Sequence, residues 1–197
     1  MGNSPLKKLR IAVHRYLIRF GIDVRKRRID RKILEQTIFP EILKSTETQH
    51  ILFVGCAWYT LHYPRIFQSH EFYTMELSHE ESKYGAPKHI IDSCENIDEH
   101  FEPSSLDVVI LNGVYGFGLN HLPAIEKTLS AIHSCLKHGG LFVFGWNDLP
   151  SATPYAIEQL TGLNAFCPYV FPVLNTAIHE SDEKNRHRFH FYRKGIA

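Results

Sequence analysis

Short apolar runs alternate with a helical pattern through the middle of the chain. Strands are predicted at 51–54, 71–77, 89–91, 106–111 and 141–144. Continuous apolar runs of this length are typical of strands that are buried on both faces. After the fourth run, helical periodicity extends from Ala124 to Leu136, with Lys137 and His138 in the last turn and Gly139-Gly140 ending the helix. Strands that alternate with helices imply parallel pairing and an α/β fold.

The N-terminal region has the pattern of two helices. Leu9, Val13, Tyr16, Leu17 and Phe20 fall on one helix face, and Gly21 is a plausible end of that helix. A second helix is predicted from about Ile29. We expect it to stop or kink before Pro40, because proline lacks a backbone donor and disfavours helical geometry in the residue before it.

The C-terminal region is different again. From Leu149 to His179 the only charged residue is Glu158, and four prolines interrupt the segment. This pattern predicts a packed, irregular stretch with one short helix, lying over the ends of the sheet. The alternation of residues 186–193 then predicts a late strand.

Charge is distributed unevenly along the 197 residues, which fit one domain. Residues 1–32 carry eleven Lys or Arg and two Asp, whereas residues 33–197 carry eleven Lys or Arg and nineteen Asp or Glu. A basic arm of this kind, at 7–32, packs on its own or a neighbouring subunit, is solvated, or lies on an anionic membrane surface. Nucleic acid is the least favoured partner, because no aromatic residues are interleaved with the charges for stacking. The sequence does not indicate an oligomeric state.

The four cysteines form no CxxC pair, and the pattern favours neither a disulfide framework nor a cysteine-based zinc site. No secretory signal is visible, and no apolar run is long enough to span a membrane. We therefore expect a cytoplasmic protein, with membrane contact, if any, peripheral. The thirteen histidines lack the spacing of metal ligands, so no metal is expected.

Polar or glycine residues stand at the end of each predicted strand. Gly55 follows the first, Glu76 ends the second, Asp92-Ser93 follows the third and Asn112 ends the fourth. In open α/β sheets, ligands bind beyond the carboxyl ends of the strands, and an acid about 20 residues after the first turn suits a ribose. Each residue alone also has a structural explanation: a turn, a solvated acid or a helix N-cap. Their joint placement favours a ligand site.

With these residues, the stretch 50–148 resembles the class I S-adenosylmethionine-dependent methyltransferases. Ile51 to Tyr59 is similar to the family's first motif, Glu76 to its ribose-binding acid, Asp92-Ser93 to its adenine-contacting motif, and 135–141 to the turn before its fifth strand. The resemblance implies a doubly wound, mostly parallel seven-stranded sheet with an antiparallel last strand. The pattern along the chain divides it into a basic helical extension at 1–46 and an α/β domain at 47–197, in which we expect 149–180 to cover the acceptor. The cofactor-binding residues it implies are Gly55, Cys56, Ala57, Glu76, Leu77, Asp92, Ser93 and Asn112.

The first motif departs from the family pattern. Phe53 stands where the family has an acid, and Ala57 and Tyr59 replace glycines. The bulky Trp58-Tyr59 loop either stacks on a ligand or fills the methionine pocket. The first alternative predicts a methyltransferase for a small-molecule or carbohydrate-like acceptor. The second predicts a non-catalytic binding or scaffold protein that works through its basic arm.

The sequence does not identify a single catalytic residue. His121 and Tyr115 are candidates for a base, with a surface loop as the plainer explanation for His121. Candidate pocket walls are Trp58, Tyr59, Tyr115, His121, Trp146 and Asn147. The glycine-rich run 112–118 lacks the Lys-Ser/Thr of a phosphate loop, and the absence of GxGxxG argues against a nicotinamide enzyme.

Overall fold

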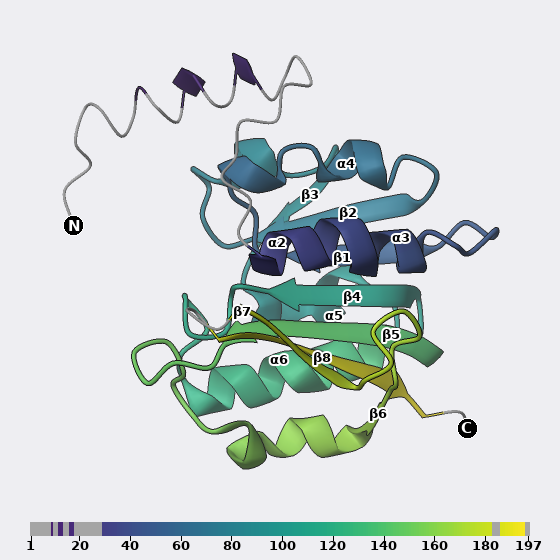
Figure 1. The fold of residues 1–197 in the computed structure, drawn as a ribbon, viewed down its shortest axis with the longest axis vertical. Coiled ribbons are helices and arrows are strands. Elements are labelled where there is room, and N and C mark those ends of the chain that lie inside the picture. The colour runs from purple at the N-terminus through teal and green to yellow at the C-terminus, as the bar shows by residue number, and fades with distance from the viewer. Residues whose placement is uncertain (1–8, 10–11, 14–15, 18–28, 183–185, 196–197) are drawn as a thin grey trace.

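The computed structural model describes residues 9, 12–13, 16–17, 29–182 and 186–195. Its eight strands are β1 (His50–Val54), β2 (Glu71–Glu76), β3 (Lys88–Ile91), β4 (Leu106–Asn112), β5 (Leu136–Asn147), β6 (Phe166–Pro168), β7 (Ile178–Asp182) and β8 (His187–Lys194). They form one sheet in the order β3-β2-β1-β4-β5-β8-β6, with β7 also paired to β8 (Figure 1). Strands β1 to β5 run parallel and β8 is antiparallel to β5. This arrangement confirms the predicted mostly parallel α/β sheet with an antiparallel last strand.

Helical segments join the strands. The N-terminal one consists of α2 (Ile29–Ile33), a π-helical turn (Leu34–Ile38) and α3 (Phe39–Ile42). The others among the described residues are α4 (Tyr63–Ile66), α5 (Ile97–His100), α6 (Leu122–Cys135) and 3₁₀ turns at Trp58–Thr60, Ser82–Tyr84, Cys94–Asn96, Ile157–Gln159 and Thr161–Ala165. None of the described helices is long and apolar enough to cross a membrane.

Alternating side chains of the central strands build two core layers. In β1, Ile51 and Phe53 pack in the cluster that contains the N-terminal helical segment, whereas Leu52 and Val54 pack in the cluster that contains α6. This alternation follows from the two-residue period of a strand. The sheet is therefore covered on both faces, and residues 29–42 are part of the core.

The N-terminal helix does not stop before Pro40; of the stop or kink that the sequence predicted, the structure shows a helical irregularity in place of an end. The π-helical turn comes just before the proline, and the Phe39 N–H donates to the Leu34 carbonyl, five residues back. A π-turn shifts the hydrogen-bond ladder by one residue, so it accommodates a position that lacks an N–H group. The helix then continues to Ile42. Most of the predicted first helix lies outside the described residues, although residues 9, 12–13 and 16–17 are helical, with Leu9, Val13 and Tyr16 exposed.

The predicted end of the long helix is wrong by about a turn. Helix α6 ends at Cys135, and Leu136 is already extended and pairs with Leu106 of β4. The pairing register then shifts before it resumes at Leu141, and Gly139 has a φ of +74°. Cross-strand pairing to β4 thus overrides the helical period of the preceding residues.

Residues 149–180 contain more regular structure than the single short helix predicted. Two 3₁₀ turns are followed by β6 and β7, which pair with successive halves of β8. Residues 169–177 leave the sheet between them. The sheet therefore has one more named strand than predicted, because one edge position is divided between β6 and β7.

Candidate functional site

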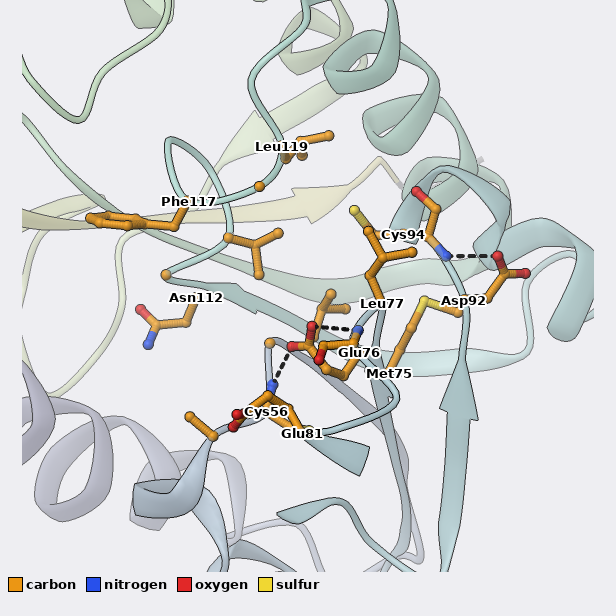
Figure 2. Close-up of a pocket in the computed structure, with 18 of the residues that line it drawn as sticks. Cys56, Met75, Glu76, Leu77, Glu81, Asp92, Cys94, Asn112, Phe117 and Leu119 are labelled. Carbon is orange, nitrogen blue, oxygen red and sulfur yellow. Dashed lines mark hydrogen bonds between the residues drawn. The ribbon is translucent and has the colours of Figure 1, made fainter. Parts of the chain in front are cut away.

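A cavity of about 590 Å³ opens at the carboxyl ends of β1, β2, β3 and β4 (Figure 2). The order of connections reverses at β1, which lies between β2 and β4, and ligands of open α/β sheets bind at such a point. All eight predicted cofactor-binding residues line this cavity: Gly55, Cys56, Ala57, Glu76, Leu77, Asp92, Ser93 and Asn112. The topology thus brings together four strand ends that are separated by up to 57 positions in the sequence.

Gly55 makes the turn after β1. Its φ of +97° is one that side chains rarely adopt. A Cβ atom there would lie 2.7 Å from Val114 Cγ2 and 3.1 Å from the Asn112 carbonyl oxygen. Only glycine fits this position without a shift, so the cavity floor depends on it.

Glu76 holds the loops after β1 and β2 together. Its Oε2 accepts from the Cys56 N–H at 3.0 Å, and its Oε1 accepts from the Ser78 N–H at 3.1 Å (Figure 2). A carboxylate has about four lone-pair positions, so each oxygen retains a position for a ligand hydroxyl. Burial raises the pKa of the adjacent Cys56 thiol to about 12, so this thiol stays neutral.

Asp92 is bound mainly by its own segment. Its carboxylate accepts from the Ser93 N–H and Asn96 Nδ2 and lies 2.8 Å from His100 Nε2. These hydrogen bonds, the one to His100 foremost, lower the pKa of Asp92. Ser93 is the N-cap of the next turn and accepts from the Glu95 N–H. The pair lines the cavity while also fixing the start of the following helical turn.

Arg31 is a cation that the sequence analysis did not single out. Its guanidinium carbon lies 4.3 Å from the centre of the Tyr59 ring, and its Nη1 donates to the Tyr63 hydroxyl at 3.1 Å. That hydroxyl donates to Glu35 Oε1 at 3.1 Å. Burial opposes the charge, but the phenols of Tyr63 and Tyr59 outweigh it and raise the pKa of Arg31, which stays protonated. The sequence did not distinguish Arg31 from its neighbours, because it is one of eleven basic residues in the arm.

The cavity also contains residues that strand ends alone do not predict. Glu81 lies in the segment after β2, Glu95 lies in the 3₁₀ turn after β3, and Phe117 and Leu119 belong to the loop after β4. The glycine-rich run 112–118 was the sequence signal for that loop, and its three glycines have positive φ in the structure.

Several predicted pocket walls lie elsewhere. Tyr59 and His121 line the cavity, but Trp58, Tyr115, Trp146 and Asn147 do not. Tyr115 is fully buried and its hydroxyl donates to the Tyr155 carbonyl, so a side chain expected as a base candidate packs in the core. Residues 149–180 also contribute none of the lining residues. Residues 152–155 pack against Tyr115 and Gly116 of the loop after β4, outside the cavity, and β6 and β7 pair with β8 at the far edge of the sheet.

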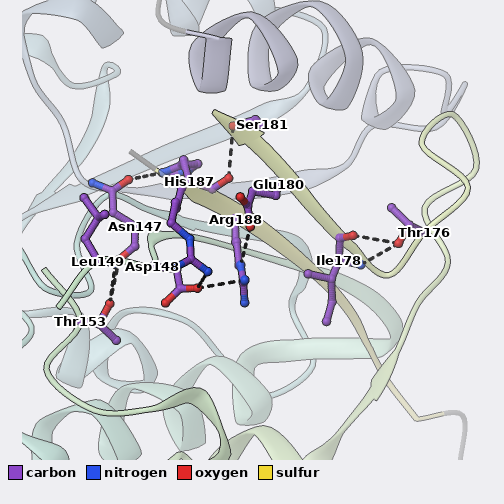
Figure 3. A network of polar contacts seen from close by, with 11 residues as sticks. Asn147, Asp148, Leu149, Thr153, Thr176, Ile178, Glu180, Ser181, His187 and Arg188 are labelled. Atoms are coloured by element: carbon purple, nitrogen blue, oxygen red, sulfur yellow. Dashed lines mark hydrogen bonds and ion pairs between the residues drawn. The ribbon is translucent and has the colours of Figure 1, made fainter. Parts of the chain in front are cut away.

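A polar network around His187 and Asp148 lies at the start of β8 (Figure 3), and His187 connects it to Asn112. His187, at the start of β8, lies 3.1 Å from Asn112 Oδ1 through Nε2 and 2.6 Å from Asn147 Oδ1 through Nδ1. Next to it, Asp148 forms ion pairs with Arg186 and Arg188. The network fixes the carboxyl ends of β4 and β5 against β8. Among the described residues, no group of three or more His, Cys, Asp or Glu has the arrangement of a metal site.

The fold is an α/β sheet with a cavity at its switch point, which is where nucleotide-like ligands bind in sheets of this kind. Residues 52–144 match the family model described as "Methyltransferase domain". This stretch, from β1 to β5, is therefore similar to a methyltransferase domain. No curated protein sequence matches the chain.

Solved structures share this fold. A TehB-like SAM-dependent methyltransferase from Corynebacterium glutamicum is 15% identical with a TM-score of 0.63, covering 97% of this chain and 100% of that one. The N-methyltransferase NodS from Bradyrhizobium japonicum is 13% identical with a TM-score of 0.60, covering 84% and 99%. A SAM-dependent methyltransferase from Archaeoglobus fulgidus is 14% identical with a TM-score of 0.57, covering 83% and 94%. At these identities the likeness concerns the fold.

Proposed function

We propose that this chain binds S-adenosylmethionine in the cavity and transfers its methyl group to a small-molecule acceptor. The observation that carries the proposal is the convergence of all eight predicted cofactor residues on one cavity of about 590 Å³. That volume lies within the usual range for small-molecule and cofactor sites.

The cavity fits the parts of the cofactor in order. Glu76 offers its remaining lone pairs to the two ribose hydroxyls, while its backbone partners keep the carboxylate in place. Leu77, which is 68% exposed and lines the cavity, offers an apolar surface for one face of the adenine. Asp92 and Ser93 lie at the end of β3, where they would meet the adenine edge.

The charge of the cavity suits a cation. Four of its lining residues are acidic and none is Lys or Arg; the acids are Glu76, Glu81, Asp92 and Glu95. When bound, the cofactor supplies an electrophilic methyl group on a positively charged sulfonium. The chain would contribute by aligning the acceptor atom with that methyl group and by excluding water. His121 lines the cavity and remains the candidate base for a hydroxyl acceptor.

The loop after β4 favours an acceptor with an apolar face. Phe117 lines the cavity and is 59% exposed, and Val114 and Leu119 lie beside it on the same loop. An exposed aromatic ring packs well against another flat ring or the C–H face of a sugar. We propose on this basis a small ring-containing acceptor, with carbohydrate-like compounds among those to be screened.

Titration calorimetry with S-adenosylmethionine and S-adenosylhomocysteine tests the proposal. We expect micromolar binding, weakened about 10- to 100-fold in Glu76→Ala, because the variant loses charge-assisted hydrogen bonds to the ribose. The matched control is Glu80→Ala, since Glu80 is an exposed acid on the next loop that does not line the cavity. Circular dichroism would check that each variant is folded. A folded wild-type chain that binds neither ligand would refute the proposal and favour a non-catalytic, scaffold role.

A further inference from the structure

The N-terminal extension has two parts whose apolar side chains have opposite environments. In the second part, from α2 to α3, Leu34, Ile38 and Phe39 are completely buried in the core layer on that face of the sheet. In the first part, Leu9 and Val13 are 63% and 48% exposed, although both lie in helical backbone (Figure 1). The core of this fold therefore uses the apolar residues of the second part and leaves these two in contact with water.

The exposed apolar side chains of the first part share one helix face. Leu9, Val13 and Tyr16 follow one another at i, i+4 and i+7, and Tyr16 is 65% exposed. A single exposed apolar residue is common on a soluble protein, but several on one stripe of a helix form a continuous surface. We call these three residues the apolar face. A stripe of this kind is stabilised when it is removed from water, so it indicates an interaction surface.

The sequence around the apolar face is strongly basic. Residues 1–28 contain nine Lys or Arg and a single acid, Asp23. The five basic residues nearest to the apolar face all fall outside its helical spacing: Lys7, Lys8, Arg10, Arg15 and Arg19. An apolar stripe with cations at the other helical positions is typical of helices that lie in an anionic lipid surface. There the apolar stripe enters the acyl boundary and the cations meet the headgroups.

A lipid surface fits both properties of this segment better than a nucleic acid does. A phosphate backbone would engage the cations but would leave Leu9 and Val13 in water. An anionic membrane offers negative charge and an apolar layer in the same plane. Residues 33–197 carry nineteen Asp or Glu against eleven Lys or Arg, so the body is repelled by such a surface and the contact is limited to the extension. Because no described helix is long and apolar enough to cross a membrane, the contact lies at the interface.

We propose that residues 7–20 dock on an anionic lipid surface. The apolar face enters the boundary between headgroups and acyl chains, and the basic residues of the segment bind the anionic headgroups. Arg25 to Arg28, four consecutive basic residues, add to the electrostatic attraction. This interaction surface is separate from the cavity, so it does not depend on the proposed methyl transfer.

Co-sedimentation of the full chain with lipid vesicles tests the proposal. One set of vesicles is an equimolar mixture of phosphatidylglycerol and phosphatidylcholine, and the other is phosphatidylcholine alone. We expect the partition coefficient to be at least about tenfold larger for the anionic vesicles. It should fall when the salt is raised from about 0.1 M to about 1 M, because the screening length shrinks from about 10 Å to about 3 Å.

The double variant Leu9→Glu/Val13→Glu tests the apolar face itself. It should lower the partition coefficient about 10- to 100-fold, because two apolar side chains are replaced by anions that face an anionic surface. The matched control is Val170→Glu/Val173→Glu, since these valines are 56% and 53% exposed on the body. The control should partition like the wild type, and circular dichroism would check that each variant is folded.

Four results would overturn the proposal. The first is a folded wild-type chain that does not bind the anionic vesicles, and the second is equal binding to both kinds of vesicle. The third is a partition coefficient that Leu9→Glu/Val13→Glu leaves unchanged or that the control variant lowers as much. The fourth is a wild-type dimer, measured by light scattering, that binds no vesicles and becomes a monomer in Leu9→Glu/Val13→Glu. This last result would assign the apolar face to a contact between two copies of the chain.

Discussion

Replacing His190 with Phe should remove a pH dependence of stability that its buried imidazole creates. His190 lies in β8, is 5% exposed, and has its ring centre 5.8 Å from that of Trp146. Its Nδ1 lies 3.2 Å from the Tyr192 hydroxyl. Burial, helped by the charge of Arg188 (Figure 3), lowers the pKa of His190 to about 4, against the opposing effect of Glu158 and Asp148.

The sign and size of the effect follow from the two protonation states. The ordinary pKa of histidine, about 6.5, applies to the unfolded chain, whereas His190 in the folded chain has a pKa of about 4. Above pH 7 both states are neutral and the group has no effect on stability. As the pH falls through 6.5, the unfolded chain takes up a proton that the folded chain excludes, so the free energy of unfolding decreases. The decrease is about 2 kcal/mol by pH 5 and about 3 kcal/mol at pH 4 and below.

Urea unfolding of the wild type and His190→Phe between pH 7.5 and pH 4.5 measures this term. The difference in unfolding free energy between the two proteins cancels the other titrating groups, and it should shift by about 2 kcal/mol in favour of the variant between pH 7.5 and pH 5. The control is His79→Phe, since His79 is exposed in the folded chain as in the unfolded one. A difference that stays constant with pH would refute the argument that burial keeps His190 neutral.

Two further predictions concern the site. Gly55→Ala should destabilise the fold by more than Gly139→Ala does, and it should also weaken S-adenosylhomocysteine binding. Both glycines have positive φ, so alanine at either position adds a backbone strain of about 1 kcal/mol. Only at Gly55 do neighbouring atoms also lie in the way of a Cβ atom. Urea unfolding and calorimetry compare them, and equal effects would contradict the steric account. At pH 8, iodoacetamide should modify exposed Cys167 far faster than buried Cys56, because burial raises the pKa of Cys56 to about 12. Peptide mass spectrometry would measure both rates, and equal rates would be inconsistent with the burial of Cys56.

The positions of the strands along the chain and the residues at their ends follow from local sequence. Apolar runs that end in glycine or a polar residue located β1 to β4 within one or two positions. The prediction that Gly55, Glu76, Asp92 and Asn112 share one site needed only the rule that parallel strands present their carboxyl ends at one edge. These features depend on the spacing of apolar residues and on the residues that form turns, and both can be seen directly in the sequence.

Long-range packing decided the rest. The end of α6 was misplaced because Leu136 pairs with Leu106, a contact that no local pattern reports. Tyr115 was expected at the site, yet its hydroxyl is bound to Tyr155, forty positions away. Arg31 was indistinguishable from other basic residues of the arm until α2 packed on the sheet and placed its guanidinium over Tyr59. The sequence by itself determined the fold class and the cofactor edge, because periodicity and strand ends are local. Only the tertiary structure decided which distant side chains reach that edge, because their positions depend on how the layers pack.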